Sequence, residues 1–269
     1  MSDTPTFRAD MAEIYERLFV PMIFESYADD LAERVAALAP ERVLEVAAGT
    51  GVVTRAMDAR LGASVAITAT DLSPAMLARA TAAGTTHAVE WRPADAQELP
   101  FPDASFDVVV CQFGVMFFPD KARAFSEVQR VLRIGGAFLF NVWDGLDDNE
   151  FAETVEQTVA SLFPDDPPRI IRRVPHGYHD AATIAGDLHR GGFAGSPRFT
   201  TLAARSHAPS AQVAAAAYCL GTPLRAEIEA RDASRLTEAM DAAAAALAVR
   251  FGEGAIEGKI QAKVVAIAR

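Results

Sequence analysis

Two glycines and two carboxylates have the types and the spacing to bind a nucleoside. Gly49 and Gly51 follow an apolar run that includes Glu45, and Asp71 ends the next apolar run. Glycine permits unusual dihedral angles and close approach of the backbone, and a helix that starts behind such a loop offers free N–H groups. A carboxylate at Asp71 can accept two hydrogen bonds from a ribose diol. Glu45 would repel a pyrophosphate and attract a cationic ligand.

A nicotinamide dinucleotide is the first ligand that this loop suggests. Its fingerprint needs a third glycine three residues after the second, and here that position is Thr54. A carboxylate as close as Glu45 also opposes a pyrophosphate. A nucleoside with a positive sulfonium and an ammonium group therefore fits these residues better than a dinucleotide.

Strands that alternate with helices must position these residues. We expect strands at 42–46, 65–70, 89–93, 106–111 and 137–142, and the unbroken apolar run at 106–111 is typical of a parallel strand buried on both faces. The alternation predicts right-handed βαβ units and an open parallel sheet. Ligands bind such sheets beyond the carboxyl ends of the strands, where Glu45, Asp71, Asp95 and Gln112 lie.

The other segments are expected to surround this sheet within one domain, 1–269. Residues 10–39 predict two helices, interrupted at Pro21, that form a lid on a core at 41–143. Residues 144–178 are rich in Asp and Pro and predict an irregular insertion, followed by a helix that Asp180 caps. Thr222 begins one long helix that ends at Gly252, between strands at 199–206 and 259–268. The insertions at 144–180 and 209–250 are expected to shape the substrate site.

Composition excludes several classes of protein. The chain has 269 residues, of which 51% are hydrophobic, so it can bury a sizeable core. Its formal charge of -11 argues against a nucleic-acid partner, which needs a basic face. No apolar run approaches the ~20 residues that span a bilayer, and the polar N-terminus resembles no signal peptide, so we expect a cytoplasmic location. Cys111 and Cys219 form no disulfide or zinc pattern, and no metal site is expected.

Six motifs stand in order along the core. They are VLEVAAGTG at 43–51, TDLSPAM at 70–76, ADAQELPF at 94–101, SFDVVVCQ at 105–112, FFPD at 117–120 and RVLRIGG at 130–136. In order and spacing they resemble the class I S-adenosylmethionine-dependent methyltransferases, in the type 11 group that is related to ubiquinone/menaquinone C-methyltransferases. The resemblance covers about 41–143. It implies a Rossmann-like α/β fold, with a mostly parallel seven-stranded sheet, helices on both faces, and helical N-terminal and inserted cap segments.

The resemblance also implies how S-adenosylmethionine would be bound. Glu45 and the loop backbone would hold its methionine end, which the backbone of Gln112 would border, and Asp71 would bind the ribose. This chain has Ala47 where the family usually has glycine. The implied cofactor positions are Glu45, Ala47, Gly49, Gly51, Asp71, Leu72 and Met76 at the adenine pocket, Asp95 and Ala96 at the adenine edge, and Gln112.

Aromatic and histidine residues are further candidates. Tyr15 and Tyr27 lie in helices that close over the cofactor in similar proteins, although half-buried core tyrosines are an equal interpretation. Phe113 is expected at the edge of an apolar acceptor pocket. His176, Tyr178 and His179 share one short loop and are weak candidates for a general base. A simple turn before the Asp180 helix is the preferred interpretation of that loop.

The predicted activity is methyl transfer from S-adenosylmethionine to a small-molecule acceptor, with S-adenosylhomocysteine as product. Whether oxygen, carbon or nitrogen is methylated stays open, and so does the choice between monomer and homodimer. A base is needed only for a hydroxyl or a carbon acid. Three alternatives remain: an NAD(P)-binding oxidoreductase, a nucleic-acid methyltransferase with a hidden basic groove, and a non-catalytic binder of the adenosyl ligand.

Overall fold

Seven strands form one mixed sheet in the computed structural model, which describes residues 9–269. Their order is β3-β2-β1-β4-β5-β7-β6. The first five strands of this order are parallel, whereas β7 is antiparallel to both β5 and β6. The predicted Rossmann-like, mostly parallel seven-stranded sheet is therefore confirmed. The strands are β1 (Arg42–Val46), β2 (Ala66–Asp71), β3 (Val89–Pro93), β4 (Phe106–Gln112), β5 (Leu132–Trp143), β6 (Arg198–Ala208) and β7 (Ile256–Ala268).

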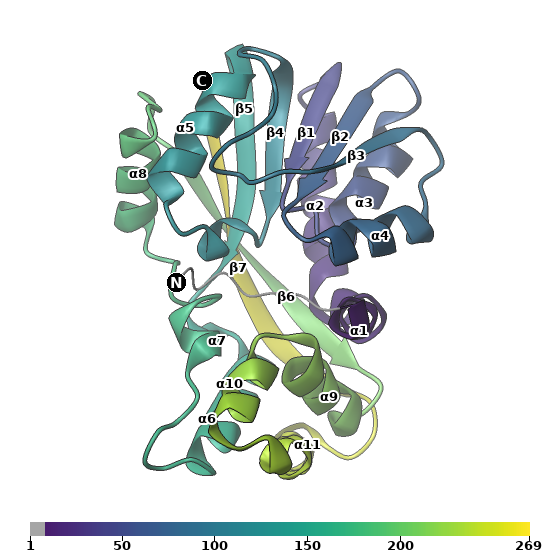
Figure 1. The fold of residues 1–269 in the computed structure, drawn as a ribbon, viewed down its shortest axis with the longest axis vertical. Helices are drawn as coiled ribbons and strands as arrows, with labels where there is room; N and C mark the ends of the chain where they lie inside the picture. Colours follow the sequence, from purple (N-terminus) through teal and green to yellow (C-terminus); the bar gives the residue numbers. More distant parts are fainter. Residues whose placement is uncertain (1–8) are drawn as a thin grey trace.

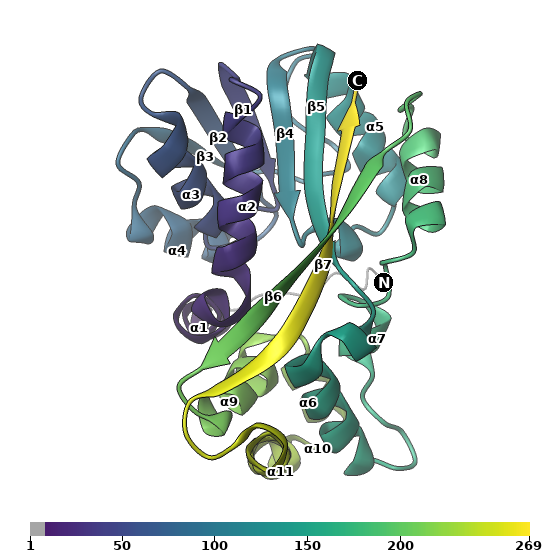
Figure 2. The same cartoon turned by 180° about the vertical axis from the view of Figure 1, so that it is seen from behind.

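Helices cover both faces of the parallel part of this sheet (Figures 1 and 2). On one face α2 (Glu25–Ala36) and α3 (Val52–Leu61) pack on Val43, Ile67 and Val110. On the other, α5 (Lys121–Val131) and α8 (Ala181–Arg190) pack on phenylalanines such as Phe138 and Phe140. Because β4 is covered on both faces, six of its seven residues are buried. Its helical neighbours leave only the strand ends free to form a site.

Side-chain caps set the start of several of these helices. Ser73 Oγ accepts a hydrogen bond from the Met76 N–H at the start of α4 (Pro74–Ala83), and Pro74 occupies its first turn. Asp120 caps α5, and Asp180 caps α8 by accepting from the Thr183 N–H at 2.7 Å. The predicted cap at Asp180 is thus confirmed.

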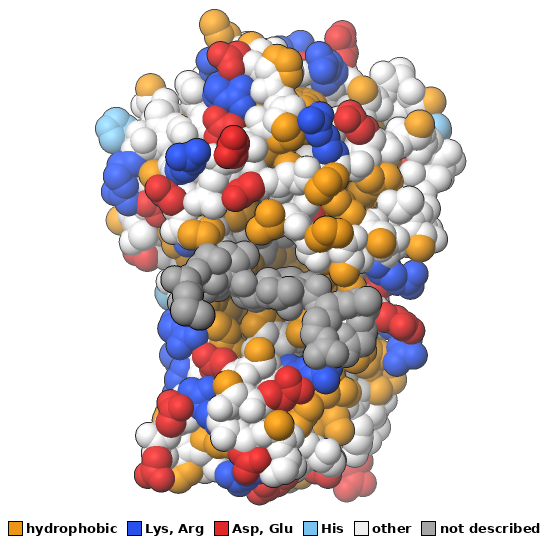
Figure 3. Space-filling view, viewed as in Figure 1, with side chains coloured by type: hydrophobic (Ala, Val, Ile, Leu, Met, Phe, Trp, Pro, Cys, Tyr) orange, Lys and Arg blue, Asp and Glu red, His pale blue; other side chains and the backbone are white. Residues whose placement is uncertain are grey.

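The antiparallel pair of β6 and β7 extends beyond the parallel strands and carries a second, helical part of the molecule (Figure 1). The surface narrows between the two parts, and hydrophobic side chains gather along this waist (Figure 3). One buried apolar cluster nevertheless runs through both parts, from Phe125 beside the sheet to Leu247 in the helical part. The helical part consists of η3 (Leu146–Asp148), α6 (Glu150–Ser161), α7 (Ile170–Arg173), α9 (Ala211–Gly221), α10 (Leu224–Asp232), η4 (Ala233–Arg235) and α11 (Leu236–Phe251).

The prediction that Pro21 separates two helices is wrong. Helical structure continues from α1 (Ala9–Ile14) through a π-helix, η1 (Tyr15–Phe24), into α2. Pro21 lies inside η1, whose wider turns accommodate a residue that lacks an N–H and would clash in an α-helix. The chain bends there, since α1 is seen end-on in Figure 1 while α2 runs along the sheet. Such π-helical segments are rare and are often found at functional sites.

Two further predictions in the second half of the chain are wrong. The expected long helix from Thr222 is three segments, because Asp232 leaves helical geometry and caps the short η4 through the Ser234 N–H. The region 144–178, expected to be irregular, contains the twelve-residue helix α6. Its buried side chains include Phe151, Val155 and Val159. Tertiary burial of this apolar stripe outweighs the turn signals of the neighbouring Asp and Pro residues.

Candidate active site

The loop between β1 and α3 has an unusually bare backbone. Gly49 and Gly51 both adopt left-handed conformations, with φ of 57° and 83°. A Cβ atom on Gly51 would lie 2.8 Å from the ring of Trp91, whereas one on Gly49 would meet nothing within 4 Å. Gly51 is therefore required for close packing on the sheet, and Gly49 faces open space.

Ala47, where the family usually has glycine, is also left-handed, with φ of 56°. A side chain in this conformation is uncommon and stores strain. Its methyl group fits because Gly114 offers no side chain: a Cβ atom there would lie 2.6 Å from the Ala47 Cβ. The departure from the family pattern is thus accommodated by a neighbouring loop.

Asp71 ties the two loops at this edge together. Its carboxylate accepts hydrogen bonds from the Gly49 N–H at 2.8 Å and from the Ser73 N–H at 2.7 Å. Burial nevertheless keeps the pKa of Asp71 above its usual range. Each carboxylate oxygen retains a lone pair for a further donor.

Glu45 is 1% exposed, at the end of β1. Burial raises its pKa to about 8, although the hydroxyl of Thr54, which donates to its Oε2, opposes the shift. A neutral carboxyl group at physiological pH can ionise when a cation binds beside it. Thr54 lies where a dinucleotide-binding loop would have its third glycine, and here its hydroxyl is the hydrogen-bond partner of Glu45.

Glu45, Ala47 and Gly49 line a small cavity of about 290 Å³, whereas Asp71 and Gly51 line neither this cavity nor the larger one that adjoins it. The Thr50 hydroxyl is buried here without a hydrogen-bond partner among the described residues, and such an unsatisfied group is expected to bind a ligand or water. The lining residues are Tyr15, Phe24, Glu45, Ala47, Ala48, Gly49, Thr50, Val52, Val53 and Gln112.

A second, larger cavity of about 740 Å³, open to solvent, adjoins the first. Tyr15 and Phe24, whose ring centroids lie 5.2 Å apart, line both cavities, so the two cavities adjoin at these rings. Phe113, with φ of 50°, stacks on Trp143 at 3.7 Å in the wall of the larger cavity. The lining residues are Tyr15, Phe19, Ile23, Phe24, Phe113, Phe117, Trp143, Asn149, Ile170, Ile171, Pro175, His176, Tyr218, Gly221, Thr222, Pro223 and Ile260.

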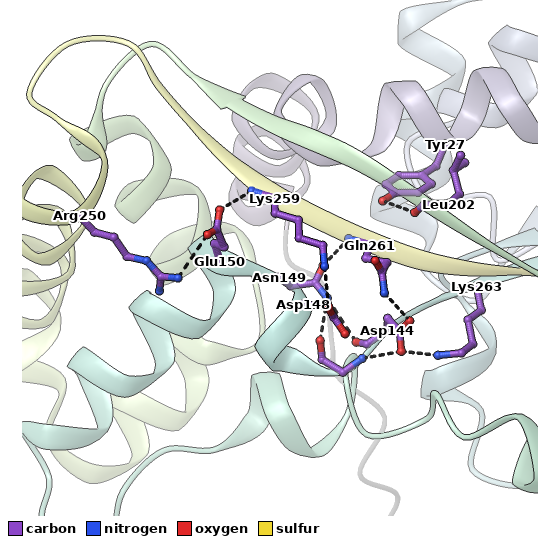
Figure 4. Close-up of polar contacts among 11 residues, drawn as sticks. Tyr27, Asp144, Asp148, Asn149, Glu150, Leu202, Arg250, Lys259, Gln261 and Lys263 are labelled. Atoms are coloured by element: carbon purple, nitrogen blue, oxygen red, sulfur yellow. Dashed lines mark hydrogen bonds and ion pairs between the residues drawn. The ribbon is translucent and has the colours of Figure 1, made fainter.

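The structure does not bring every candidate residue to these cavities. Tyr27 is fully buried and donates a hydrogen bond to the Leu202 carbonyl at 3.3 Å (Figure 4). Asp95 accepts from the Gln97 N–H in its own loop. Leu72 is 55% exposed, Met76 and Ala96 are buried, and none of these five residues lines either cavity.

Of the three candidates for a general base, only one lines a cavity. Tyr178 donates its hydroxyl hydrogen bond to Asp187 at 2.8 Å, and His179 Nδ1 bonds to the His176 carbonyl. Neither lines the larger cavity. His176 lines it and is 6% exposed.

Several residues of the site carry no signal in the sequence. Trp143 and Tyr218 meet in one cavity wall from distant segments, and no motif marks either of them. Thr50 was detectable in principle, because it lies between the two loop glycines. Phe24 had no signal of its own in the sequence beyond its place in the segment 10–39, which was expected to form a lid.

Within residues 9–269, no group of three or more His, Cys, Asp or Glu side chains is arranged to hold a metal ion. In the same residues, no helix has both the length and the apolar character to cross a membrane.

Comparison with known sequences identifies the core. Residues 44–140 match the family described as a methyltransferase domain. An uncharacterized protein of Mycobacterium bovis is 46% identical over 98 residues, which are 36% of this chain and 35% of the relative. The demethylmenaquinone methyltransferase of Deinococcus radiodurans is 40% identical over 107 residues, 39% of this chain and 44% of the relative. The chain thus aligns with less than half the length of these relatives.

Solved structures agree on the fold over most of the chain. The YcgJ protein of Bacillus subtilis has a TM-score of 0.56 at 20% identity, covering 91% of this chain and 99% of that one. The cyclase SpnF also reaches 0.56, at 19% identity and with 98% and 97% covered. Phosphoethanolamine N-methyltransferase 2 of Haemonchus contortus, solved with S-adenosylhomocysteine, also has a TM-score of 0.56. It is 17% identical, and the match covers 96% of this chain and 56% of that one.

The sheet order and the solved structures define a Rossmann-like α/β fold. Residues 44–140 match the methyltransferase domain family, and this part of the chain is similar in sequence to demethylmenaquinone and ubiquinone/menaquinone C-methyltransferases.

Proposed function

We propose that this protein transfers a methyl group from S-adenosylmethionine to a small apolar acceptor. The observation that carries the proposal is the pair of adjoining cavities: a smaller one at the glycine loop, which Glu45, Thr50 and Gln112 help to line, and a larger apolar one beside it, with Tyr15 and Phe24 lining both. A donor in the smaller cavity and an acceptor in the larger one would meet where the two cavities adjoin.

The smaller cavity fits S-adenosylmethionine chemically. The open space beside Gly49 leaves room for the ligand, and the Thr50 hydroxyl, which has no partner among the described residues, can form a hydrogen bond with that ligand. Asp71 would accept from the ribose hydroxyls, and Glu45 would face the cationic methionine end. Bound S-adenosylmethionine would supply a methyl group already activated on sulfur.

The apolar cavity would hold the acceptor and exclude water. Among residues 9–269, no Asp, Glu, Lys or Arg side chain lines it. Precise placement of two reactants can supply up to ~7–11 kcal/mol of a barrier, so the chain needs to contribute little covalent chemistry. In this proposal, residues 10–39 act as the lid, and the segments 144–180 and 209–250 provide the acceptor walls.

The acceptor of the menaquinone-related relatives is not carried over to this chain. The family match ends at residue 140, and the residues from Trp143 to Ile260 that line the apolar cavity lie beyond it. One protein of the same fold is named a cyclase, so a test must detect methyl transfer itself.

The test combines ligand binding with turnover. Calorimetric titration with S-adenosylhomocysteine should show saturable binding at one site per chain, and titration with NAD should not. Methyl-labelled S-adenosylmethionine and a panel of phenols, amines and thiols should then give a labelled product together with S-adenosylhomocysteine. Binding of NAD alone would instead support the oxidoreductase alternative, and binding without turnover would support a non-catalytic binder.

A further inference from the structure

His176 contributes a basic nitrogen to the largely apolar wall of the larger cavity. Its Nδ1 lies 2.9 Å from the Asp144 carbonyl oxygen, which can only accept a hydrogen bond, so Nδ1 carries the proton. The lone pair is therefore on Nε2. That atom has no hydrogen-bond partner among the described residues, and His176 lines the larger cavity.

A polar cluster at the start of the helical part holds this arrangement (Figure 4). The Asp144 carboxylate accepts hydrogen bonds from Lys263 and from Gln261 Nε2, at 2.9 Å for the latter, which ties the end of β5 to β7. Asn149 donates to the carbonyls of Asp144 and Gly145 and accepts from the Gln261 N–H at 3.2 Å. The segment that presents the Asp144 carbonyl is thus clamped from two sides.

Asn149 is the other amide or imidazole side chain in the cavity wall, and its side-chain nitrogen and oxygen are both engaged in this clamp. His176 differs from Asn149 because its Nε2 remains available to accept a hydrogen bond. Burial is the main reason why the pKa of the His176 imidazole is lowered to about 4. The hydrogen bond to the Asp144 carbonyl and the charge of the Asp144 carboxylate raise this pKa, whereas the charges of His179 and Arg172 lower it further. The ring is neutral at physiological pH.

We propose that His176 is a catalytic base, whose Nε2 accepts the hydroxyl proton of a phenol-like acceptor in the apolar cavity. The inference rests on the proposed methyl transfer and narrows its acceptor to an oxygen nucleophile. A protonated amine would need a counter-charge, and the described lining of this cavity has none. A neutral aromatic ring with one hydroxyl group matches walls that are built from aromatic rings.

The step balances without any further reactant. The acceptor oxygen forms the new C–O bond with one of its lone pairs, and the C–S bond breaks with its electrons left on sulfur, which becomes neutral. The hydroxyl proton moves to Nε2 and later to water. Because that proton becomes strongly acidic as the C–O bond forms, even a weakly basic imidazole can accept it in the transition state.

The decisive experiment uses the full-length protein and the variant His176→Asn. The asparagine amide can still donate to the Asp144 carbonyl but has no group at the place of Nε2. With phenol as acceptor, kcat/KM should fall by about 10²- to 10⁴-fold. With 4-nitrophenol, at a pH where it is already ionised, the loss should be less than about tenfold, because no proton remains to be removed. Affinity for S-adenosylhomocysteine should not change.

The matched control is His207→Asn, since His207 lies on β6 with a 60% exposed side chain paired with Glu257. It should leave both acceptors unaffected. Equal losses with phenol and 4-nitrophenol would overturn the catalytic role. Methylation of amines or thiols with no phenol methylated would overturn the acceptor class while leaving the proposed methyl transfer intact. Failure to bind S-adenosylhomocysteine would reject both.

A readout without turnover tests the same geometry. The ¹⁵N spectrum of labelled histidine, assigned by comparison with His176→Asn, should show His176 protonated on Nδ1. Its Nε2 resonance should shift when phenol is added in the presence of S-adenosylhomocysteine. A resonance protonated on Nε2, or one that phenol does not move, would contradict the proposal.

Discussion

At the scale of single residues, the carboxyl groups at the glycine loop combine structural and binding roles. Glu45 lines the smaller cavity from a buried position where an ionised carboxylate would be costly. Asp71 bridges two loops through backbone N–H groups. In the proposed function both would face the cationic adenosyl ligand, because the backbone holds them at the strand ends.

Glu45 should make the stability of the free protein depend on pH. Its pKa in the folded protein, about 8, lies above the usual value of 4.5 expected in the unfolded chain. Between these values the unfolded state binds fewer protons, so the stabilising contribution is complete below about pH 4.5 and is lost as the pH rises through 8. Replacement by Gln keeps an acceptor for Thr54 and removes the titration.

Thermal unfolding of Glu45→Gln and the unchanged protein should therefore be compared from pH 5 to 8. The stability advantage of the variant should grow by about 1 kcal/mol per pH unit. A difference that stays constant over this range would show that Glu45 is already ionised in the folded protein.

Asp71→Ala should weaken binding of S-adenosylhomocysteine by about 1–3 kcal/mol, the scale of hydrogen bonds to a charged partner. Asp71→Asn, which keeps one carbonyl acceptor, should lose less. Isothermal titration calorimetry measures both, with Asp103→Ala as control, because Asp103 is an exposed carboxylate paired with Arg130 on the surface. Unchanged affinity in Asp71→Ala would rule out the ribose assignment.

At the scale of elements, η1 is attached to the glycine loop by one arginine. Arg55 on α3 donates to the Thr50 carbonyl at 2.7 Å and to Glu16 on η1 at 2.7 Å. Tyr15, the neighbour of Glu16, lines both cavities, and its hydroxyl pKa is raised by burial and then by the charges of Asp71 and Glu16. The π-helix is thus coupled to the donor cavity through a few polar contacts.

Arg55→Ala should loosen this coupling. We expect amide hydrogen exchange in Tyr15–Phe24 to accelerate and affinity for S-adenosylhomocysteine to fall by about 1–2 kcal/mol, because two charge-assisted hydrogen bonds are lost. Arg60→Ala on the same helix is the matched control, since its pair with Asp29 is exposed and worth at most ~1 kcal/mol. Equal effects of the two variants would show that the arginine has no special role at η1.

At the scale of the whole molecule, the sheet part and the helical part share strands and a core. β6 and β7 are paired along the whole length of β6, and the apolar cluster that contains Phe125 also contains Phe151 and Leu247. The active-site cavities depend on this continuity, because the larger one draws walls from both parts. We therefore expect the two parts to unfold together.

Phe151→Ala tests this cooperativity. Phe151 is fully buried on α6, packs edge-on against Phe251 and occupies the space where a Gly258 side chain would lie. The substitution should lower the free energy of unfolding by about 3–5 kcal/mol. Hydrogen exchange should accelerate to the same extent in α9 and in the distant β4. The control Val249→Ala, at a site that is 90% exposed, should change stability by less than ~0.5 kcal/mol. Acceleration confined to the helical part would show two independent folding units.

The sequence by itself determined the sheet and the edge at which ligands bind. Strand and helix patterns, the glycines of the first loop and the caps at Ser73 and Asp180 are all short-range signals, because they depend on residues a few positions apart. They predicted the parallel strands, and with the family resemblance the methyltransferase class. They failed at Pro21 and in α6, where packing against distant segments outweighs local preference.

Only the tertiary structure decided what surrounds the acceptor cavity. Trp143, His176 and Tyr218 come from three segments that no motif connects, and they meet because β7 and its neighbours bring the helical part back onto the strand ends. The tautomer of His176 likewise depends on the Asp144 carbonyl, which Gln261 and Lys263 hold in place from more than a hundred residues away. Such contacts are set by burial and chain reversal, and local residue patterns do not encode them.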